Sequence, residues 1–244
     1  MKNKFAVVTG SSTGIGQAIA LELAKQGVFI ALAGRAQDKL LKTKSLIAQN
    51  GGQSEVFLGD FTKLDSLNAL IALIKQRTEE IDILVNVAGI WHGPDEVYAG
   101  KDFGSFSQQV ILDTYTVGLT APTLLTHAFI PLMKDGGKIL NISGTFENGA
   151  KGWLPYFVSK KAIEDLTIGL AEELKDKNIQ VNAISPSDTA TEAYRKYFPQ
   201  YIDDAIEPSQ IAKQAALLCS DESKVTGKVF VMKKGKEPYE GYHT

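Results

Sequence analysis

The segment that decides the fold reads Phe5-Ala6-Val7-Val8-Thr9-Gly10-Ser11-Ser12-Thr13-Gly14-Ile15-Gly16. Its first four residues are apolar and favour a strand, while the apolar residues Ile15, Ile19 and Leu23 repeat at helical spacing. We therefore expect a strand, a glycine-rich turn and a helix. Many such turns use glycine for structural reasons alone. At the opening of a first β-α unit, however, the N–H groups of the turn and the positive end of the helix suit a pyrophosphate.

The same order of strand and helix recurs along the chain. Further strands are expected over residues 28–33, 55–58, 81–85, 138–142 and 179–184, and further helices over 37–49, 64–77, 119–133, 156–174 and 211–218. Strands that alternate with helices predict a parallel sheet, and nearly continuous apolar strands predict helices on both of its faces. The expected fold is α/β, a doubly wound, Rossmann-like parallel sheet. Without a linker, charge block or low-complexity tract, residues 1–244 are predicted to form a single domain.

Composition excludes several classes of function. The chain has 26 basic and 28 acidic residues, so no overall positive field favours nucleic acid or an anionic membrane. Cys219 is the only cysteine, and its apolar helical surroundings predict a buried thiol and no internal disulfide. No apolar stretch is long enough for a signal peptide or a membrane span, so a cytoplasmic location is expected. The three histidines are scattered and predict no metal site.

The end of the second predicted strand bears on the choice of cofactor. In dinucleotide-binding folds this position faces the adenosine ribose, where an acidic residue binds the 2'-hydroxyl of NAD(H) and a basic residue binds the 2'-phosphate of NADP(H). Here the strand ends in Ala33-Gly34-Arg35 and lacks the acid. The forked guanidinium of Arg35 favours NADP(H), with NAD(H) as the second possibility. The alternative is an ordinary solvated arginine.

A tyrosine and a lysine lie four residues apart at the start of a predicted helix. The run is Tyr156-Phe157-Val158-Ser159-Lys160, and its spacing places Tyr156 and Lys160 on one helix face. A free tyrosine titrates about three units above neutrality, too high for an efficient acid or base. An ammonium about 5 Å away favours the phenolate by roughly 3 kcal/mol, which closes most of that gap. The pair also occurs often by chance.

Together, these motifs resemble the short-chain dehydrogenase/reductase family, and in particular its short bacterial carbonyl reductases. The resemblance rests on the glycine turn, Asp60, the run Asn86-Val87-Ala88-Gly89 and the pair Tyr156 and Lys160, and it spans nearly the whole chain. It implies hydride transfer between NADP(H) and a carbonyl or alcohol, with Tyr156 as general acid or base and Lys160 beside it. It also implies a homo-oligomer, either a dimer or a tetramer.

The resemblance assigns most residues of the cofactor site. The pyrophosphate would lie along Gly10, Ser12, Thr13, Gly14 and Ile15, the adenine against Asp60 and Phe61, and the nicotinamide half above Asn86, Ala88 and Gly89. Lys160 would also bind the nicotinamide ribose. The loop after the sixth strand, Ser185-Pro186-Ser187-Asp188-Thr189-Ala190-Thr191, resembles one that meets the carboxamide, with Ser187 in place of a glycine. The residues that it contributes are Pro186, Ser187, Thr189 and Thr191.

Two positions depart from the family pattern. Gly118 stands where an asparagine usually helps to relay protons through water. The family serine is ambiguous in Asn141-Ile142-Ser143-Gly144, because alignment on the strand selects Gly144, whereas counting back from Tyr156 selects Ser143. Such a hydroxyl polarises the substrate oxygen, and its loss costs roughly 3 kcal/mol. We expect Ser143 to serve, or Thr145 in its place; alternatively, Ser143 only satisfies a strand end.

Aromatic residues gather in the segments expected to overhang the site. The predicted substrate contacts are Trp91, Phe146, Trp153 and Tyr194, with polar contacts from His92, Glu147 and Asp188 as a further possibility. Such a lining suits an apolar or ring-bearing small molecule, although about half of these rings are expected only to pack a loop onto the sheet. The predicted function is carbonyl reduction. The second hypothesis is a regulatory or sensor protein that binds the dinucleotide with little turnover.

Overall fold

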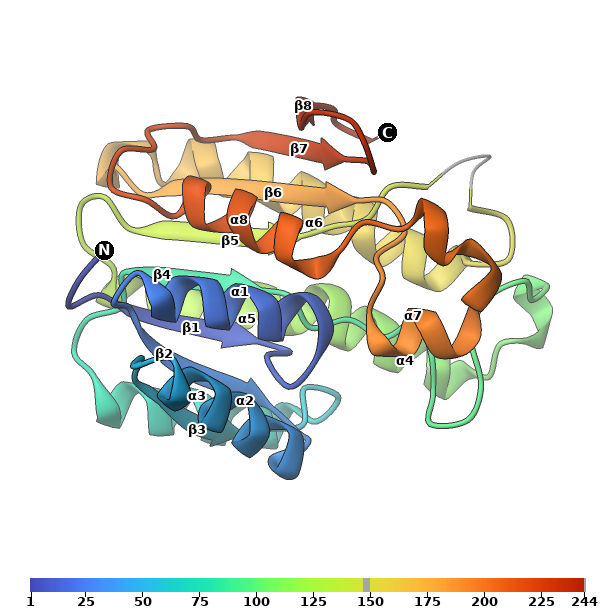
Figure 1. The fold of residues 1–244 in the computed structure, drawn as a ribbon, viewed down its shortest axis with the longest axis horizontal. Helices are drawn as coiled ribbons and strands as arrows, with labels where there is room; N and C mark the ends of the chain where they lie inside the picture. The colour runs from blue at the N-terminus through green and yellow to red at the C-terminus, as the bar shows by residue number, and fades with distance from the viewer. Residues whose placement is uncertain (147–149, 244) are drawn as a thin grey trace.

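An eight-stranded sheet runs through the centre of the molecule (Figure 1). The structure is a computed structural model that describes residues 1–146 and 150–243, so Glu147 lies outside the described residues. The strand order is β3-β2-β1-β4-β5-β6-β7-β8, and every pair is parallel except β7 with β8. The strands are β1 (Phe5–Thr9), β2 (Phe29–Gly34), β3 (Ser54–Leu58), β4 (Ile83–Asn86), β5 (Lys138–Ile142), β6 (Gln180–Pro186), β7 (Lys228–Met232) and β8 (Tyr239–Glu240).

Helices cover both faces of the sheet, as predicted. One apolar cluster joins the sheet to α1 (Gly14–Lys25), α2 (Gln37–Gln49) and α8 (Pro208–Leu218). The second cluster joins the opposite face to α3 (Leu64–Arg77), α5 (Ala121–Phe129) and α6 (Leu154–Glu173). Two shorter helices, α4 (Gln108–Tyr115) and α7 (Glu192–Tyr197), lie near the carboxyl ends of the strands (Figure 1). The doubly wound α/β fold is confirmed.

Strand β1 shows why this sheet needs two layers of helices. All five of its residues are buried. Ala6 and Val8 belong to one apolar cluster and Phe5 and Val7 to the other, because successive side chains of a strand point to opposite faces. Both faces of the strand are therefore removed from water when the helices pack. Burial of a side chain the size of valine or phenylalanine contributes about 1.5–3 kcal/mol to the free energy of folding.

Contacts from distant residues hold the ends of the central strands and the glycine turn together. The Thr9 hydroxyl accepts hydrogen bonds from the Val87 N–H at 2.9 Å and the Ala88 N–H at 3.2 Å, which ties the end of β1 to the segment after β4. On the other side, the Thr43 hydroxyl of α2 donates to the Ser11 carbonyl at 3.0 Å. These bonds fix the turn between β1 and α1.

The region before β5 differs from the sequence prediction. The predicted helix over residues 119–133 is divided into a π-helical turn (Thr116–Thr120), α5 and a 3-10 turn (Ile130–Leu132), while α4 precedes them without having been predicted. The two prolines Pro122 and Pro131 lie at the starts of α5 and of the 3-10 turn, where a missing N–H is tolerated. The prolines therefore mark boundaries within one apolar run.

The packing of the glycine turn predicts that Gly16→Ala lowers the free energy of unfolding far more than Gly169→Ala does. A Cβ at Gly16 would lie 2.3 Å from the Gly10 carbonyl oxygen, so Gly16→Ala forces the backbone of the turn to move. We expect a loss of about 2 kcal/mol or more in unfolding free energy, measured by urea denaturation. Gly169→Ala is the matched control, because nothing lies within 4 Å of its Cβ and alanine favours helix by up to about 1 kcal/mol. Equal stability of the two variants would contradict this account of the turn.

Candidate active site

A cavity of about 1230 Å³ lies at the carboxyl ends of the strands. It begins at the glycine turn and extends to α6 and to the loop after β6. It brings together the predicted cofactor residues Gly10, Ser12, Thr13, Gly14, Ile15, Arg35, Asp60, Phe61, Ala88, Gly89, Tyr156, Lys160, Pro186, Ser187, Thr189 and Thr191. Ser143 and the predicted substrate contacts Trp91, Phe146, Trp153 and Tyr194 also line it. Asn86 lines a separate, smaller cavity behind it.

The glycine turn and the loop after β6 face each other across the start of the cavity. A Cβ at Gly14 would lie 3.0 Å from the Thr191 Cγ2 atom, so the two segments are in direct contact there. Thr191 is also the N-cap of α7, and its hydroxyl accepts from the Tyr194 N–H at 3.1 Å. The capping bond fixes the loop beside the turn, and both segments line the cavity in which a pyrophosphate would lie.

Charged residues lie at the far end of the cavity, next to β2. Arg35 is exposed there, and Lys39 of α2, which sequence reasoning missed, lines the same region. Asp60 accepts hydrogen bonds from the Thr62 hydroxyl at 2.8 Å and the Thr62 N–H at 3.1 Å. Although partial burial acts to raise it, these bonds and the nearby Arg35 hold the pKa of Asp60 below its ordinary value. This end of the cavity therefore has two cations and one ionised carboxylate.

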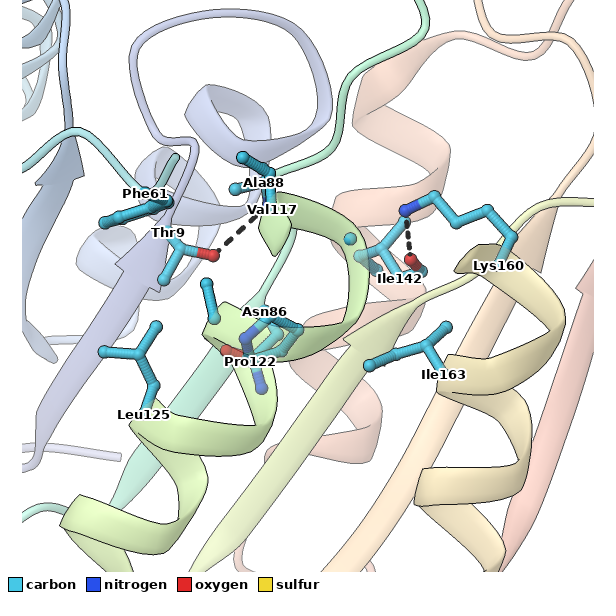
Figure 2. A pocket seen from close by; sticks show the side chains of 12 residues that line it. Thr9, Phe61, Asn86, Ala88, Val117, Pro122, Leu125, Ile142, Lys160 and Ile163 are labelled. Atoms are coloured by element: carbon cyan, nitrogen blue, oxygen red, sulfur yellow. Dashed lines mark hydrogen bonds between the residues drawn. The ribbon is translucent and has the colours of Figure 1, made fainter. Parts of the chain in front are cut away.

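Tyr156 and Lys160 lie on one face of α6, as their spacing predicted. The Lys160 Nζ atom is 5.4 Å from the centre of the Tyr156 ring. It donates to the Ile142 carbonyl at the end of β5 at 2.7 Å (Figure 2). Lys160 is only 3% exposed. A Cβ at Gly89 would lie 3.3 Å from the Lys160 Nζ and 3.6 Å from the Tyr156 ring, so glycine at 89 lets both side chains approach the segment after β4.

Burial has a larger effect on this pair than the sequence-based estimate allowed. It raises the pKa of Tyr156 and lowers the pKa of Lys160 to about 8, because both charged forms lose water. The estimate counted the attraction between ammonium and phenolate and omitted desolvation, so the expected lowering of the Tyr156 pKa is wrong for this arrangement. At pH 7 the phenol holds its proton and Lys160 is mostly charged. The pair therefore combines a neutral phenol with a neighbouring ammonium.

A cavity of about 10 Å³ lies behind the pair and touches Gly118 (Figure 2). A Cβ at Gly118 would lie 2.8 Å from the Ser159 Cβ and Oγ atoms, so an asparagine does not fit there unless Ser159 moves. Asn86, on the cavity wall, donates from Nδ2 to Asn141 Oδ1 at 2.9 Å. That bond joins β4 to β5 beneath the site. Asn86 therefore supports the floor of the site and does not line the large cavity.

The two candidate hydroxyls are both engaged in hydrogen bonds. The Ser143 hydroxyl contacts the Lys160 carbonyl at 2.9 Å and the Glu164 Oε1 atom at 2.6 Å. The Thr145 hydroxyl donates to the Ser185 carbonyl at 2.9 Å. Both residues line the cavity, yet neither directs its proton into it in this arrangement. A Cβ at Gly144, in contrast, would lie 3.8 Å from the Lys160 Cγ and 3.3 Å from the Phe146 ring.

Aromatic rings form a continuous wall around Tyr156. Its ring centre is 5.8 Å from that of Phe146 and 6.2 Å from that of Trp153. Trp153 is in turn 6.3 Å from Trp91, and Trp91 is 6.2 Å from Phe198 at the end of α7. Separations of this size are typical of packed aromatic pairs. The phenol therefore lies on an apolar, ring-lined side of the cavity.

Among residues 1–146 and 150–243, no group of three or more histidine, cysteine, aspartate or glutamate side chains is arranged to hold a metal ion. Within the same part of the chain, no helix has both the length and the apolar character needed to cross a membrane.

Comparisons with known proteins agree with this geometry. An uncharacterized oxidoreductase of Escherichia coli, YgcW, is 34% identical over 195 residues, which cover 79% of this chain and 72% of that protein. A dehydrogenase/reductase from Sinorhizobium meliloti shares 29% identity with a TM-score of 0.84, over 96% of this chain and 95% of that one. The landomycin C-6 ketoreductase LanV, solved with bound NADP and rabelomycin, shares 26% identity with a TM-score of 0.81 over 94% of each chain.

A family model matches most of the chain. Residues 4–202 match the family model described as short chain dehydrogenase. The match therefore covers more than half of the chain. That span includes the glycine turn, the segment after β4, the pair on α6 and the loop after β6. This chain belongs to the short-chain dehydrogenase/reductase family of oxidoreductases.

Proposed function

We propose that the protein is an NADP(H)-dependent reductase of small carbonyl compounds, with Tyr156 as the proton donor. The observation that carries the proposal is the position of Tyr156 and Lys160, stacked on α6 in the wall of a cavity that begins at the phosphate-suited glycine turn. A dinucleotide bound along that cavity would bring its nicotinamide toward the phenol. The same groups serve the reverse reaction, alcohol oxidation.

The residues of the chain account for the proton side of the reaction. A bound nicotinamide cofactor supplies the hydride, which the carbonyl carbon accepts. The carbonyl oxygen takes the proton from the Tyr156 hydroxyl, which burial keeps protonated at neutral pH. The Lys160 ammonium, fixed by the Ile142 carbonyl, then stabilises the phenolate that remains. The rings beside Tyr156 make that side of the cavity apolar, which strengthens the attraction between the ammonium and the phenolate.

The charges next to β2 support a preference for NADP(H). Arg35 and Lys39 both line that end of the cavity, and a 2'-phosphate there would meet two cations. The Asp60 carboxylate is occupied by Thr62. The related ketoreductase LanV was solved with NADP, which agrees with this assignment.

The substrate class that fits best is a ring-bearing ketone. Phe146, Trp153 and Trp91 surround the phenol, and flat rings stack on such walls. Tyr194 adds a hydroxyl whose pKa is raised by burial and by its hydrogen bond to Asp188, so it stays protonated. LanV was solved with rabelomycin, which points to ketone-bearing ligands of this kind.

A specific observation favours the second hypothesis, a dinucleotide-binding sensor with little turnover. Gly118 stands in place of the family asparagine, alignment on the strand places Gly144 at the family serine, and Ser143 and Thr145 direct their hydroxyls to protein acceptors. The remaining machinery is the pair on α6. Turnover separates the two hypotheses, because both require cofactor binding.

The first prediction concerns Tyr156→Phe. We expect NADPH-dependent reduction of at least one compound in a panel of aromatic and aliphatic ketones, aldehydes and 3-oxoacyl thioesters. In Tyr156→Phe, kcat should fall by about 100-fold or more, because the proton donor is lost, while the Kd for NADPH stays within about twofold. Tyr201→Phe, an exposed tyrosine outside the cavity, is the control. Tight NADPH binding by the wild-type protein without turnover across the panel would favour the sensor.

The second prediction tests the missing hydroxyl. Gly144→Ser places a hydroxyl on the cavity wall beside Lys160, after a shift of a few tenths of an ångström by Phe146. We expect kcat to rise about tenfold or more, since a donor to the developing oxyanion is added. Gly144→Ala has the same Cβ without the hydroxyl and should show no rise. Equal rates for the serine and alanine variants would refute this assignment.

The third prediction concerns the cofactor. Arg35→Ala should raise the Kd for NADPH about tenfold or more and leave the Kd for NADH nearly unchanged, because a charge-assisted bond to the 2'-phosphate is lost. Lys42→Ala, an exposed lysine of α2 outside the cavity, controls for the general loss of positive charge. Titration of cofactor fluorescence measures both constants. Equal losses of affinity for NADPH and NADH would show that Arg35 does not bind the 2'-phosphate.

A further inference from the structure

Glu164 is a fully buried carboxylate for which the proposed reaction has no use. It follows Lys160 by four residues on α6, so Tyr156, Lys160 and Glu164 form one column along the helix. A buried carboxylate is costly unless it is paired and hydrogen-bonded. The groups that bind the Glu164 carboxylate therefore indicate its role in the structure.

Three donors reach the Glu164 carboxylate from different parts of the chain. Ser143 donates to Oε1 at 2.6 Å from the end of β5, and the Lys161 ammonium lies 3.3 Å from the same oxygen. The backbone N–H of His243 donates to Oε2 at 2.8 Å. Glu164 thus joins the wall of the active site to a segment more than 75 residues further along the chain.

That segment, residues 241–243, is here called the tail segment. It follows β8, which pairs with the edge strand β7, and the Gly241 N–H donates to the Val229 carbonyl at 3.0 Å. Tyr242 and His243 both contact the Asp165 carboxylate of α6, His243 through Nε2 at 3.0 Å. His243 adopts a backbone φ of 58°, which is uncommon for a residue other than glycine. Several contacts thus hold the tail segment on α6.

The polar network continues from Glu164 to the catalytic turn of α6. The Ser143 hydroxyl has a single proton, which it shares between Glu164 Oε1 at 2.6 Å and the Lys160 carbonyl at 2.9 Å. Lys160 is joined to β5 a second time through its ammonium and the Ile142 carbonyl. The catalytic turn therefore meets β5 at two points, and at one of them Glu164 sets the position of the Ser143 hydroxyl.

We infer that Glu164 is a positioning residue, which the docked tail segment completes by supplying the His243 N–H. In this arrangement Ser143 is not a donor to the substrate; it links Glu164 to the backbone of Lys160. Undocking of the tail segment leaves one carboxylate oxygen without that buried donor and loosens the catalytic turn. The inference rests on the proposed function for its effect on turnover, whereas the network itself does not.

The test uses a chain that ends at Gly241, Glu164→Gln, and the two changes combined. We expect each single change to lower kcat about tenfold while the Kd for NADPH stays within about twofold. The double variant should be no slower than either single one, because both interrupt the same network. The matched control is Tyr242→Phe, which removes one side-chain bond to Asp165 and keeps the His243 contacts and its backbone N–H. Its kcat should stay within about twofold of wild type.

Two outcomes would overturn the inference. One is an unchanged kcat in the chain that ends at Gly241, and the other is a double variant whose loss is the product of the single losses. Urea unfolding midpoints of the same variants give a readout without turnover, and additive shifts there would also overturn it. A wild-type protein without turnover contradicts only the proposed function. If Glu164→Gln does not fold, Ser143→Ala interrupts the network at its other end and replaces it in the cycle.

Discussion

The site depends on one buried hydrogen bond, from the Lys160 ammonium to the Ile142 carbonyl. A cation in a nearly dry position needs an acceptor, and the last carbonyl of β5 supplies it. The bond joins α6 to the carboxyl end of β5. It also holds the ammonium beside the Tyr156 ring. Glycine at 89 leaves room for the pair, because a Cβ there would lie 3.3 Å from the Lys160 Nζ and would displace it by a few tenths of an ångström.

The charge states of Tyr156 and Lys160 define this site more than the hydroxyl groups of Ser143 and Thr145 do. Burial keeps the phenol protonated and lowers the pKa of Lys160 to about 8. In the proposed reaction, proton donation and stabilisation of the resulting phenolate would come from these two neighbouring residues. The Ser143 hydroxyl donates to Glu164. An enzyme of the proposed kind would retain its proton donor and forgo about 3 kcal/mol of oxyanion stabilisation.

Local patterns predicted much of the fold, and distant contacts explain what they missed. Helices over 37–49 and 64–77 and the strand over 138–142 match the structure, because their apolar periodicity is strong and their boundaries are local. Most residues of the cavity followed from the resemblance to the family, which the glycine turn and the pair four residues apart carry in the sequence. The hydrogen bonds of Ser143 and the docking of the tail segment depend on residues far apart in the chain. Desolvation of Tyr156 depends on rings contributed by several loops, which no local pattern reveals.

The central claim is that the phenol of Tyr156, beside a fixed ammonium, meets the reacting end of a dinucleotide held by the glycine turn. The most direct measurement is a crystal structure with NADPH and a ketone substrate analogue. The account predicts the Tyr156 hydroxyl within about 3.5 Å of the analogue's carbonyl oxygen, with the Lys160 ammonium next to the nicotinamide ribose. A phenol turned away from both the carbonyl and Lys160, with the cofactor bound, would contradict it.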